Sequence, residues 1–222
     1  MQKFDTAGPV SVVLDIPAGR VRLIATERAD AAVEIQPSDT SKKRDVKAAE
    51  QTGVEYRDGV LRITTADPHR LFGSSGSLEV TVELPSGSRL EGKAGAAELY
   101  TTGRLDEVAF DGGYRTVQIA ETGGARLKVH TGAVSVARLT GPAWISNGMG
   151  DITVAEAVTG KVTLRTGSGS LSIGTAPGVS ATLDAKTGYG RIANALTNTD
   201  GPAAALAIEA TTDHGDIDAH SL

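Results

Sequence analysis

The sequence predicts an all-β protein that folds as one continuous right-handed β-solenoid with a hairpin-rich N-terminal part. Between Trp144 and Ala193, one phrase occurs three times: a hydrophobic strand, a polar residue with Gly, a second Gly one position on, and an aliphatic strand. A repeat of this length that alternates strand and turn is typical of stacked coils, in which each coil covers its neighbour's apolar face. Parallel crossovers are right-handed as a rule, so we expect a right-handed coil. The apolar residues after successive turns lie 17 to 21 positions apart, at Leu99, Val117, Val134, Ile152, Leu171 and Ile192.

The composition fits thin coils and excludes several kinds of site. Aromatic residues make up 4% of the chain, and there are 27 Gly and no Cys. Without Cys there are no disulfides, thiolate nucleophiles or iron–sulfur clusters. A net charge of −5, from 22 basic and 27 acidic residues, argues against nucleic acid or anionic lipid as the main partner, because both need a concentrated basic surface.

No run approaches the ~20 apolar residues of a spanning helix, and the first residues lack a leader pattern. We therefore expect no direct membrane insertion and a cytoplasmic location.

Residues 1–92 are predicted to be irregular strands and hairpins. Alternation of apolar and polar residues indicates strands at 10–16, 21–25 and 32–35, with a turn at 17–19 between the first two. The charged segment 38–52 is either a short helix or a solvated loop.

A hairpin, a loop and a further strand complete this part. Asp58-Gly59 lies between two apolar runs and predicts the turn of a β-hairpin, because this dipeptide readily supplies positive φ. Segment 67–77 has turn chemistry throughout and predicts an exposed loop. Residues 78–84 alternate cleanly and predict a strand.

Residues 93–222 are predicted to be regular coils of about 18–21 residues, so that the whole chain, 1–222, is one solenoid domain. The last step, from Ile192 to Ile217, is 25 residues long, and a loop insertion near 195–205 accounts for the excess. Corners require Gly because a Cβ at positive φ is costly. The predicted structural turn residues are Gly148, Gly150, Gly167, Gly169, Gly188, Gly190 and Gly215.

The single Trp and the C-terminal residues give two further predictions. Trp144 falls in a row otherwise filled by Leu, at Leu127, Leu164 and Leu183, so core packing is the favoured interpretation. The alternative is an exposed anchor for a partner. The polar C-terminal residues 216–222 are expected to blunt an open end of the stack.

The chain resembles a known bacterial family in three motifs. They are I16-P-A-G-R-V-R-L-I-A25, the strand V80-T-V-E-L-P-S-G-S88, and the repeated T-G-x-G-x-[LI] coils. Together they are similar to the β-strand-repeat family called "putative adhesin" or toastrack domains, of actinobacterial type. The resemblance implies a single-stranded right-handed β-helix with a more sandwich-like N-terminal part. It also implies a sensing or assembly platform linked to envelope-stress systems, and it carries over no catalytic residue.

The densest group of candidate metal ligands lies near the C-terminus. Asp216 and Asp218 would point the same way on a strand, and carboxylates with an imidazole such as that of His220 suit divalent metals. The Gly-Asp pair also occurs at Gly150-Asp151, which favours a turn role for Asp216. These three residues are weak metal candidates, and we predict no cofactor.

The sequence shows no catalytic constellation. Gly167-Ser168-Gly169-Ser170 lacks a third Gly and a following helix, so it predicts a corner instead of a phosphate site. The four His residues are widely spread, no G-x-S-x-G elbow occurs, and acidic residues do not recur on one coil face. We therefore predict no enzyme and no catalytic residue.

The predicted function is a non-enzymatic scaffold or protein-interaction module. It would bind an unknown protein partner through a flat coil face or an open end, within a bacterial envelope or stress-linked complex. The alternative is a carbohydrate-binding or carbohydrate-active β-helix. A third expectation is self-association through the solenoid ends.

Overall fold

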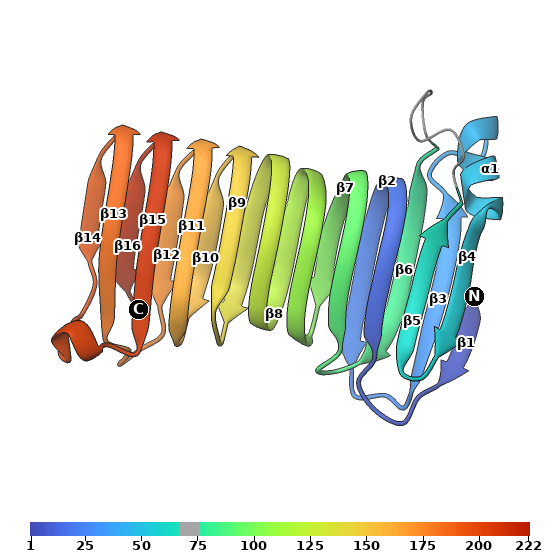
Figure 1. The fold of residues 1–222 in the computed structure, drawn as a ribbon, viewed down its shortest axis with the longest axis horizontal. Coiled ribbons are helices and arrows are strands. Elements are labelled where there is room, and N and C mark those ends of the chain that lie inside the picture. Colours follow the sequence, from blue (N-terminus) through green and yellow to red (C-terminus); the bar gives the residue numbers. More distant parts are fainter. Residues whose placement is uncertain (67–75) are drawn as a thin grey trace. The chain divides into compact units, whose positions relative to one another are not determined.

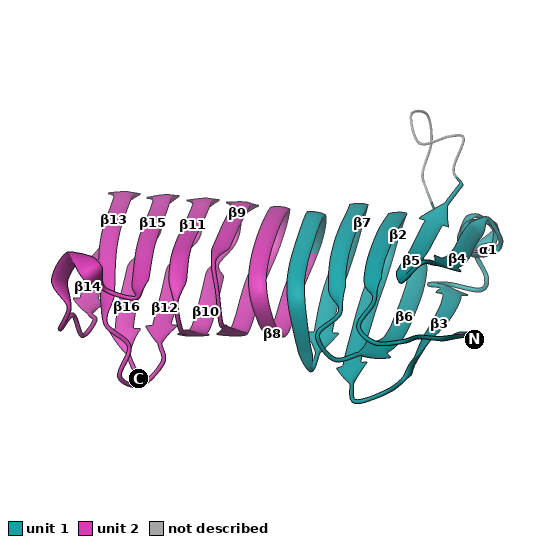
Figure 2. Ribbon diagram, turned by 60° about the horizontal axis from the view of Figure 1, so that its bottom comes forward, with its two compact units in different colours: residues 1–114 teal, residues 115–222 magenta. Residues whose placement is uncertain are grey.

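The computed structural model describes residues 1–66 and 76–222, and most of these residues form β-strands (Figure 1). The strands belong to a large mixed sheet that does not close on itself. The chain forms two compact units, unit 1 (Met1–Tyr114) and unit 2 (Arg115–Leu222) (Figure 2). Most of the loop predicted at 67–77 lies outside the described residues. That the whole chain is one domain, changing character at residue 92, stays a prediction.

Unit 1 combines parallel and antiparallel strands with one helix. In sheet order, its main path is β1-β3-β6-β2-β7, and β4 and β5 extend from β2. The elements are β1 (Gln2–Asp5), β2 (Ser11–Thr26), β3 (Asp30–Pro37), α1 (Lys43–Glu50), β4 (Thr52–Arg57), β5 (Val60–Thr65), β6 (Leu78–Pro85), β7 (Arg89–Thr102) and the first part of β8 (Arg104–Leu139).

The turn predicted at residues 17–19 is wrong, because β2 runs through it as one strand. Its first half, Ser11–Asp15, pairs in parallel with β5, and its second half, from Gly19 to Thr26, pairs with β6. Both halves pair with β7. Gly19 has φ +136, and a Cβ there would lie 1.9 Å from the carbonyl oxygen of Leu78. The segment is therefore a bend between two partners and not a hairpin turn.

The predicted hairpin is confirmed, and the segment 38–52 contains a helix. β4 and β5 pair antiparallel around Asp58 and Gly59, which have φ +50 and +78. Helix α1 contacts β3, β4 and β6, and it buries Ala48 and the carboxylate of Asp45. The Asp45 carboxylate accepts a hydrogen bond from the backbone N–H of Ser77 at 3.0 Å. This bond offsets part of the free-energy cost of burying the carboxylate.

Unit 2 is built from parallel strands in two ladders. The first ladder follows the order β8-β9-β11-β15-β13, and the second follows β8-β10-β12-β16-β14. We call two consecutive strands, one in each ladder, a rung. Besides the last part of β8, the elements are β9 (Ala143–Met149), β10 (Ile152–Ala157), β11 (Gly160–Ser168), β12 (Leu171–Thr175), β13 (Ala181–Tyr189), β14 (Ile192–Ala195), the short 3-10 helix η1 (Gly201–Ala203), β15 (Leu206–His214) and β16 (Ile217–Ser221).

The rungs do not stack in sequence order. Ile152 pairs with Val134 and Leu171, as the repeat predicts. Leu171, however, pairs with Ile217, and Ile192 pairs with the far side of Ile217. The β15–β16 rung is thus inserted between β11–β12 and β13–β14 (Figure 1). The expectation that residues 216–222 blunt an open end is therefore wrong, because β16 lies between two strands and β14 is the last strand.

The interior of unit 2 is an aliphatic core closed at one corner by polar side chains. Ile152, Leu171 and Ile217 are each 0–1% exposed. At the corner, the hydroxyl of Thr166 donates to the carbonyl oxygen of Gly150 at 3.0 Å, and that of Thr212 donates to Gly169 at 2.9 Å. Thr187 makes the same bond to Gly215. Each Thr of the repeated phrase thus ties its rung to the carbonyl of the rung beside it.

Candidate interaction surface

The last rung of unit 2, β13–β14, has no strand beyond it within the described residues. We call the surface formed by Leu183, Ala185, Tyr189 and Ile192 of this rung the end surface. In the interior rungs, the residues equivalent to Ile192 are buried at 0–1% exposure, whereas Ile192 is 46% exposed. Leu183 is half-exposed, although its neighbour in the ladder, Ile208, is buried. Aliphatic side chains of core type are therefore open at this end.

The return of the chain through residues 196–205 explains why the end is only partly covered. The backbone N–H of Ala181 donates to the carbonyl oxygen of Thr197 at 3.0 Å, and the hydroxyl of Ser180 accepts from the N–H groups of Thr199 and Asp200 at 3.1 Å. These bonds hold the segment against the start of β13, where Ala181 is buried. From Asp184 to Gly188, exposed and half-exposed residues alternate along β13.

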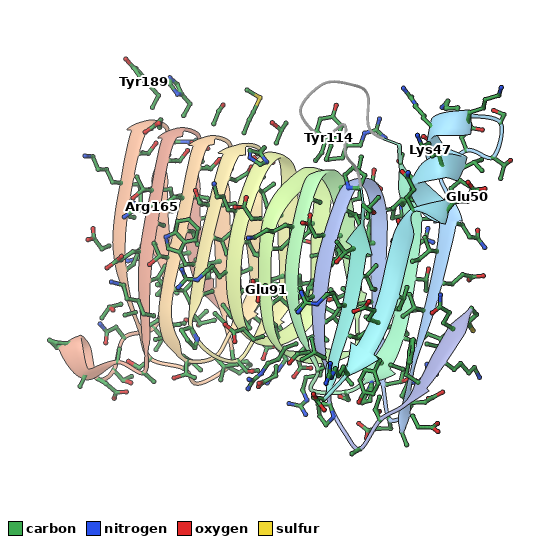
Figure 3. The ribbon with its side chains drawn as sticks, turned by 45° about the vertical axis from the view of Figure 1, so that its right-hand side comes forward. Lys47, Glu50, Glu91, Tyr114, Arg165 and Tyr189 are labelled. Carbon is green, nitrogen blue, oxygen red and sulfur yellow. The ribbon has the colours of Figure 1, made fainter. Side chains whose placement is uncertain are left out.

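Aromatic and sulfur-containing side chains are exposed at the corner beside the end surface. Tyr189 is 74% exposed and points away from the strands (Figure 3). Its ring stacks on that of His214 from the neighbouring strand, with the ring centroids 5.1 Å apart. The same column continues through Ser168 to Met149, which is 59% exposed. Exposed Tyr and Met side chains of this kind are enriched at protein interfaces.

The outer face of the first ladder carries charges in ordered columns. Arg165, which projects outward in Figure 3, and Lys186 flank Thr211 in one column. In the adjacent column, Asp184 lies beside Glu209, a neighbour of like charge. The Lys161 ammonium lies 2.7 Å from the Glu209 carboxylate and, chiefly through this bond, lowers the pKa of Glu209. The structure gives Asp184 and Lys186 no ion pair among the described residues.

The three weak metal candidates, Asp216, Asp218 and His220, make two separate sets of contacts. The Asp216 carboxylate accepts a hydrogen bond from the backbone N–H of Arg191 at 2.8 Å, which with the Arg191 guanidinium lowers the pKa of Asp216. Asp151 makes the equivalent bond to Ser170 at 2.7 Å. Asp218 instead lies on β16, where its carboxylate is 2.8 Å from Nδ1 of His220. Within residues 1–66 and 76–222, no three His, Asp or Glu side chains converge on a possible metal position.

The preferred interpretation of Trp144 is wrong. Trp144 is 38% exposed on the outer face of β9, and Ile145 takes its expected place in the buried row between Leu127 and Leu164. Because side chains alternate along a strand, a shift of one position moves a residue to the other face. The exposed ring agrees with the alternative of an accessible anchor.

The predicted turn glycines lie in two columns of unit 2, and one of these columns is at a corner. Gly150, Gly169, Gly190 and Gly215 all have φ between +129 and +154. At Gly169, a Cβ would lie 2.2 Å from the carbonyl oxygen of Gly150 in the next rung. The other three, Gly148, Gly167 and Gly188, lie inside β9, β11 and β13 and not at a turn, and each passes close to the backbone of a neighbouring rung.

Two of the described histidines each contact another side chain. His214 stacks on Tyr189, His220 pairs with Asp218, and the residue opposite His220 in the parallel ladder is Gly174. His69 lies outside the described residues. A shallow hollow of about 360 Å³ beside β4 and β5 is lined by Gln51, Gly53, Glu55, Arg62, Thr64 and Ala66.

No helix in residues 1–66 and 76–222 is long and apolar enough to cross a membrane.

The comparisons with known proteins find similar structures only. No protein-family model matches the chain, and no curated protein matches it. A crystal structure of a "putative adhesin" from Bacteroides fragilis is 9% identical, with a TM-score of 0.44 over 98% of this chain and 95% of that one. One from Parabacteroides merdae is 12% identical, with a TM-score of 0.40 over 98% and 94%. A "putative cell adhesion protein" from Clostridium sporogenes is 12% identical, with a TM-score of 0.36 over 100% and 98%. The first two of these bacterial proteins bear the name of the family that the sequence resembles.

Proposed function

We propose that the chain is a non-enzymatic protein-interaction module that binds its partner through the end surface of unit 2. The observation that carries this proposal is the 46% exposure of Ile192. Its counterparts in the interior rungs, Ile152, Leu171 and Ile217, are buried. Exposed apolar surface is unfavourable in water by about 25 cal/mol per Å². A strand edge with open backbone groups beside it favours pairing with another chain.

The architecture supports a scaffold role in a second way. We propose that the two ladders of unit 2 are opposite faces of a right-handed, single-stranded β-solenoid. Such a stack is rigid, because each rung is bonded to both neighbours, and its ends and faces stay fixed for binding. An envelope or stress-linked complex is what the family resemblance implies, and the cytoplasmic location stays a prediction. No observation among the described residues favours the carbohydrate alternative.

The proposal is tested by placing a photo-cross-linking amino acid at Ile192 in the full chain. Irradiation in a lysate of the source cells should join the probe to one protein species, either another copy of the chain or a different protein. The matched control carries the probe at Thr153, an exposed residue of β10 in the same unit. We expect cross-links at position 192 and none at position 153.

Two results would overturn the proposal. One is a probe at position 192 that gives no protein adduct above the control. The other is specific binding of the purified chain to a glycan array, abolished by Tyr189→Ser, without any protein adduct. That second result would support the carbohydrate alternative.

A further inference from the structure

We propose that the occupant of the end surface is a second copy of this chain, paired with the first through antiparallel β13 strands centred on Ala185. This inference rests on the proposed function, because it names the partner of the end surface. Strand β13 pairs with β15 on one side and, within the described residues, with no strand on the other. An edge of this kind is a template for adding a further strand.

The charges along β13 are complementary to themselves. Asp184 and Lys186 are both exposed and flank Ala185. When two identical strands pair antiparallel with Ala185 facing its own copy, Asp184 of each chain faces Lys186 of the other. Directly opposite residues in an antiparallel pair have their side chains on the same face and close together, so both contacts are favourable. A two-fold symmetric contact needs this self-complementarity, because it uses the same patch twice.

The second copy also supplies what Asp184 lacks within its own chain. Its neighbour in the parallel ladder is Glu209, whose carboxylate is already occupied by Lys161. Lys186 has Thr211 as its neighbour. A cation opposite Asp184 and an anion opposite Lys186 are therefore both provided by the same pairing. The uncovered Leu183 and Ala185, which face inward, then lie in the middle of a continuous ladder.

Head-to-tail association would instead join β13 to unit 1, whose outer strands β1 and β4 also have an open edge among the described residues. There α1 packs against β3, β4 and β6, and the outer strands β1 and β4 pair antiparallel with their neighbours. A two-fold pairing through β13 closes at the dimer, whereas a head-to-tail contact continues into filaments. The inference therefore predicts dimers and no larger species.

Sedimentation of the full chain over a range of concentrations tests the pairing by charge reversal. Asp184→Lys and Lys186→Asp each replace two attractive contacts by two repulsive ones, and each should raise the dimer dissociation constant by about tenfold or more. The double variant Asp184→Lys/Lys186→Asp restores the complementarity and should return the constant to within about threefold of the original. Asp218→Lys, the same change at an exposed position on β16, is the control and should leave it unaltered.

A distance measurement tests the register independently of stability. The chain has no Cys, so Arg165→Cys gives one spin-label site on the outer face of β11. Five strand spacings separate β11 from its copy across the paired β13 strands, which with the two-residue offset gives roughly 25 Å between labels. Double electron–electron resonance at concentrations that favour the dimer should show this distance.

The possible results separate the two proposals. A monomeric chain at ~1 mM whose probe at position 192 captures a different protein would overturn the self-pairing and leave the interaction module standing. A monomer without any adduct would overturn both. Dimers that ignore the charge reversals, label distances far from the expected one, or species that keep growing with concentration would each overturn pairing through β13.

Discussion

Two residues of the repeated phrase have separate physical roles. The Thr hydroxyl donates a hydrogen bond to a carbonyl oxygen at the corner, as Thr166 does to Gly150, which also accepts one from the Asn147 side-chain amide. The following Gly lets two rungs approach so closely that a methyl group would collide with the neighbouring backbone. Because a lost hydrogen bond and a backbone clash both cost free energy, both residue types recur with the coil.

Substitution of a corner glycine measures the second role. Gly169→Ala forces a Cβ into a position 2.2 Å from the Gly150 carbonyl oxygen at φ +148, and we expect it to lower the free energy of unfolding by about 3 kcal/mol. Gly178→Ala is the control: φ is +78, but no atom lies within 4 Å of the new Cβ, so only about 1 kcal/mol should be lost. Urea denaturation compares the two. Equal losses would show that φ alone, and not the close approach, makes glycine necessary.

We predict that the Asp216 carboxylate makes an acid-sensitive contact between the β15–β16 rung and the last rung. Its pKa is lowered below the ordinary value by the hydrogen bond from the Arg191 backbone N–H. A carboxyl group whose pKa is lower in the folded state stabilises that state above its unfolded-state pKa, and this contribution is lost as the pH falls through the folded-state pKa. The loss should therefore occur below about pH 4.

Nuclear magnetic resonance tests this by following two signals against pH, that of the Arg191 amide proton and that of the Asp216 carboxyl carbon. The amide proton should move upfield as the carboxyl is protonated, and both titration curves should have the same midpoint pH. Asp216→Asn keeps an oxygen acceptor but cannot titrate, so its Arg191 signal should stay constant over the same pH range. An Arg191 signal that titrates equally in the variant would assign the effect to another group.

At the scale of elements, the sequence predicts that the rungs stack, but it does not predict their order. The β15–β16 rung lies between β11–β12 and β13–β14. The steps from Val134 through Ile152 to Leu171 predict neighbouring strands correctly. The periodicity cannot order the last two rungs, because Ile192 and Ile217 fit beside Leu171 equally well. The only signal is the 25-residue step between them. A longer connection is needed when the chain crosses over a rung and returns.

The position of the candidate surface was hidden for the same reason. Ile192 belongs to a repeated phrase whose other copies bury this position, so nothing local marks it as exposed. Its exposure follows from which rung is last, and that depends on the path of residues 196–205. Trp144 shows a different difficulty, since only the register of β9 decides which of two adjacent apolar residues faces inward.

Pairs of spin labels test the order of the rungs. Ser172, Asp218 and Ala193 occupy one column on the outer face of the second ladder. Labels at Ser172→Cys and Asp218→Cys should be one strand spacing apart, about 5 Å between backbones, and those at Ser172→Cys and Ala193→Cys about 10 Å. Continuous-wave spectra should therefore be broadened more strongly for the first pair. Stacking in sequence order requires the opposite result, with the pair at 172 and 193 broadened more.

At the scale of the whole molecule, the course of β8 bears on whether the two units unfold together. The division between the units falls at Tyr114 and Arg115, inside the continuous strand Arg104–Leu139. Independent domains are usually joined by exposed, flexible linkers with few contacts. In stacked folds, each repeat stabilises its neighbours, and unfolding spreads from one to the next. We therefore predict that the chain unfolds in one transition, as the single domain expected from the sequence would.

The single Trp makes this prediction testable, because Trp144 reports on unit 2 alone, whereas far-ultraviolet circular dichroism reports on the strands of both units. In guanidinium chloride, the two signals should give the same midpoint, since one cooperative unit has one transition for every probe. Gly169→Ala, which lies in unit 2, should then shift both curves equally. If fluorescence followed only the first of two dichroism steps, and the variant moved that step alone, the units would be independent and the strand that joins them would carry no coupling.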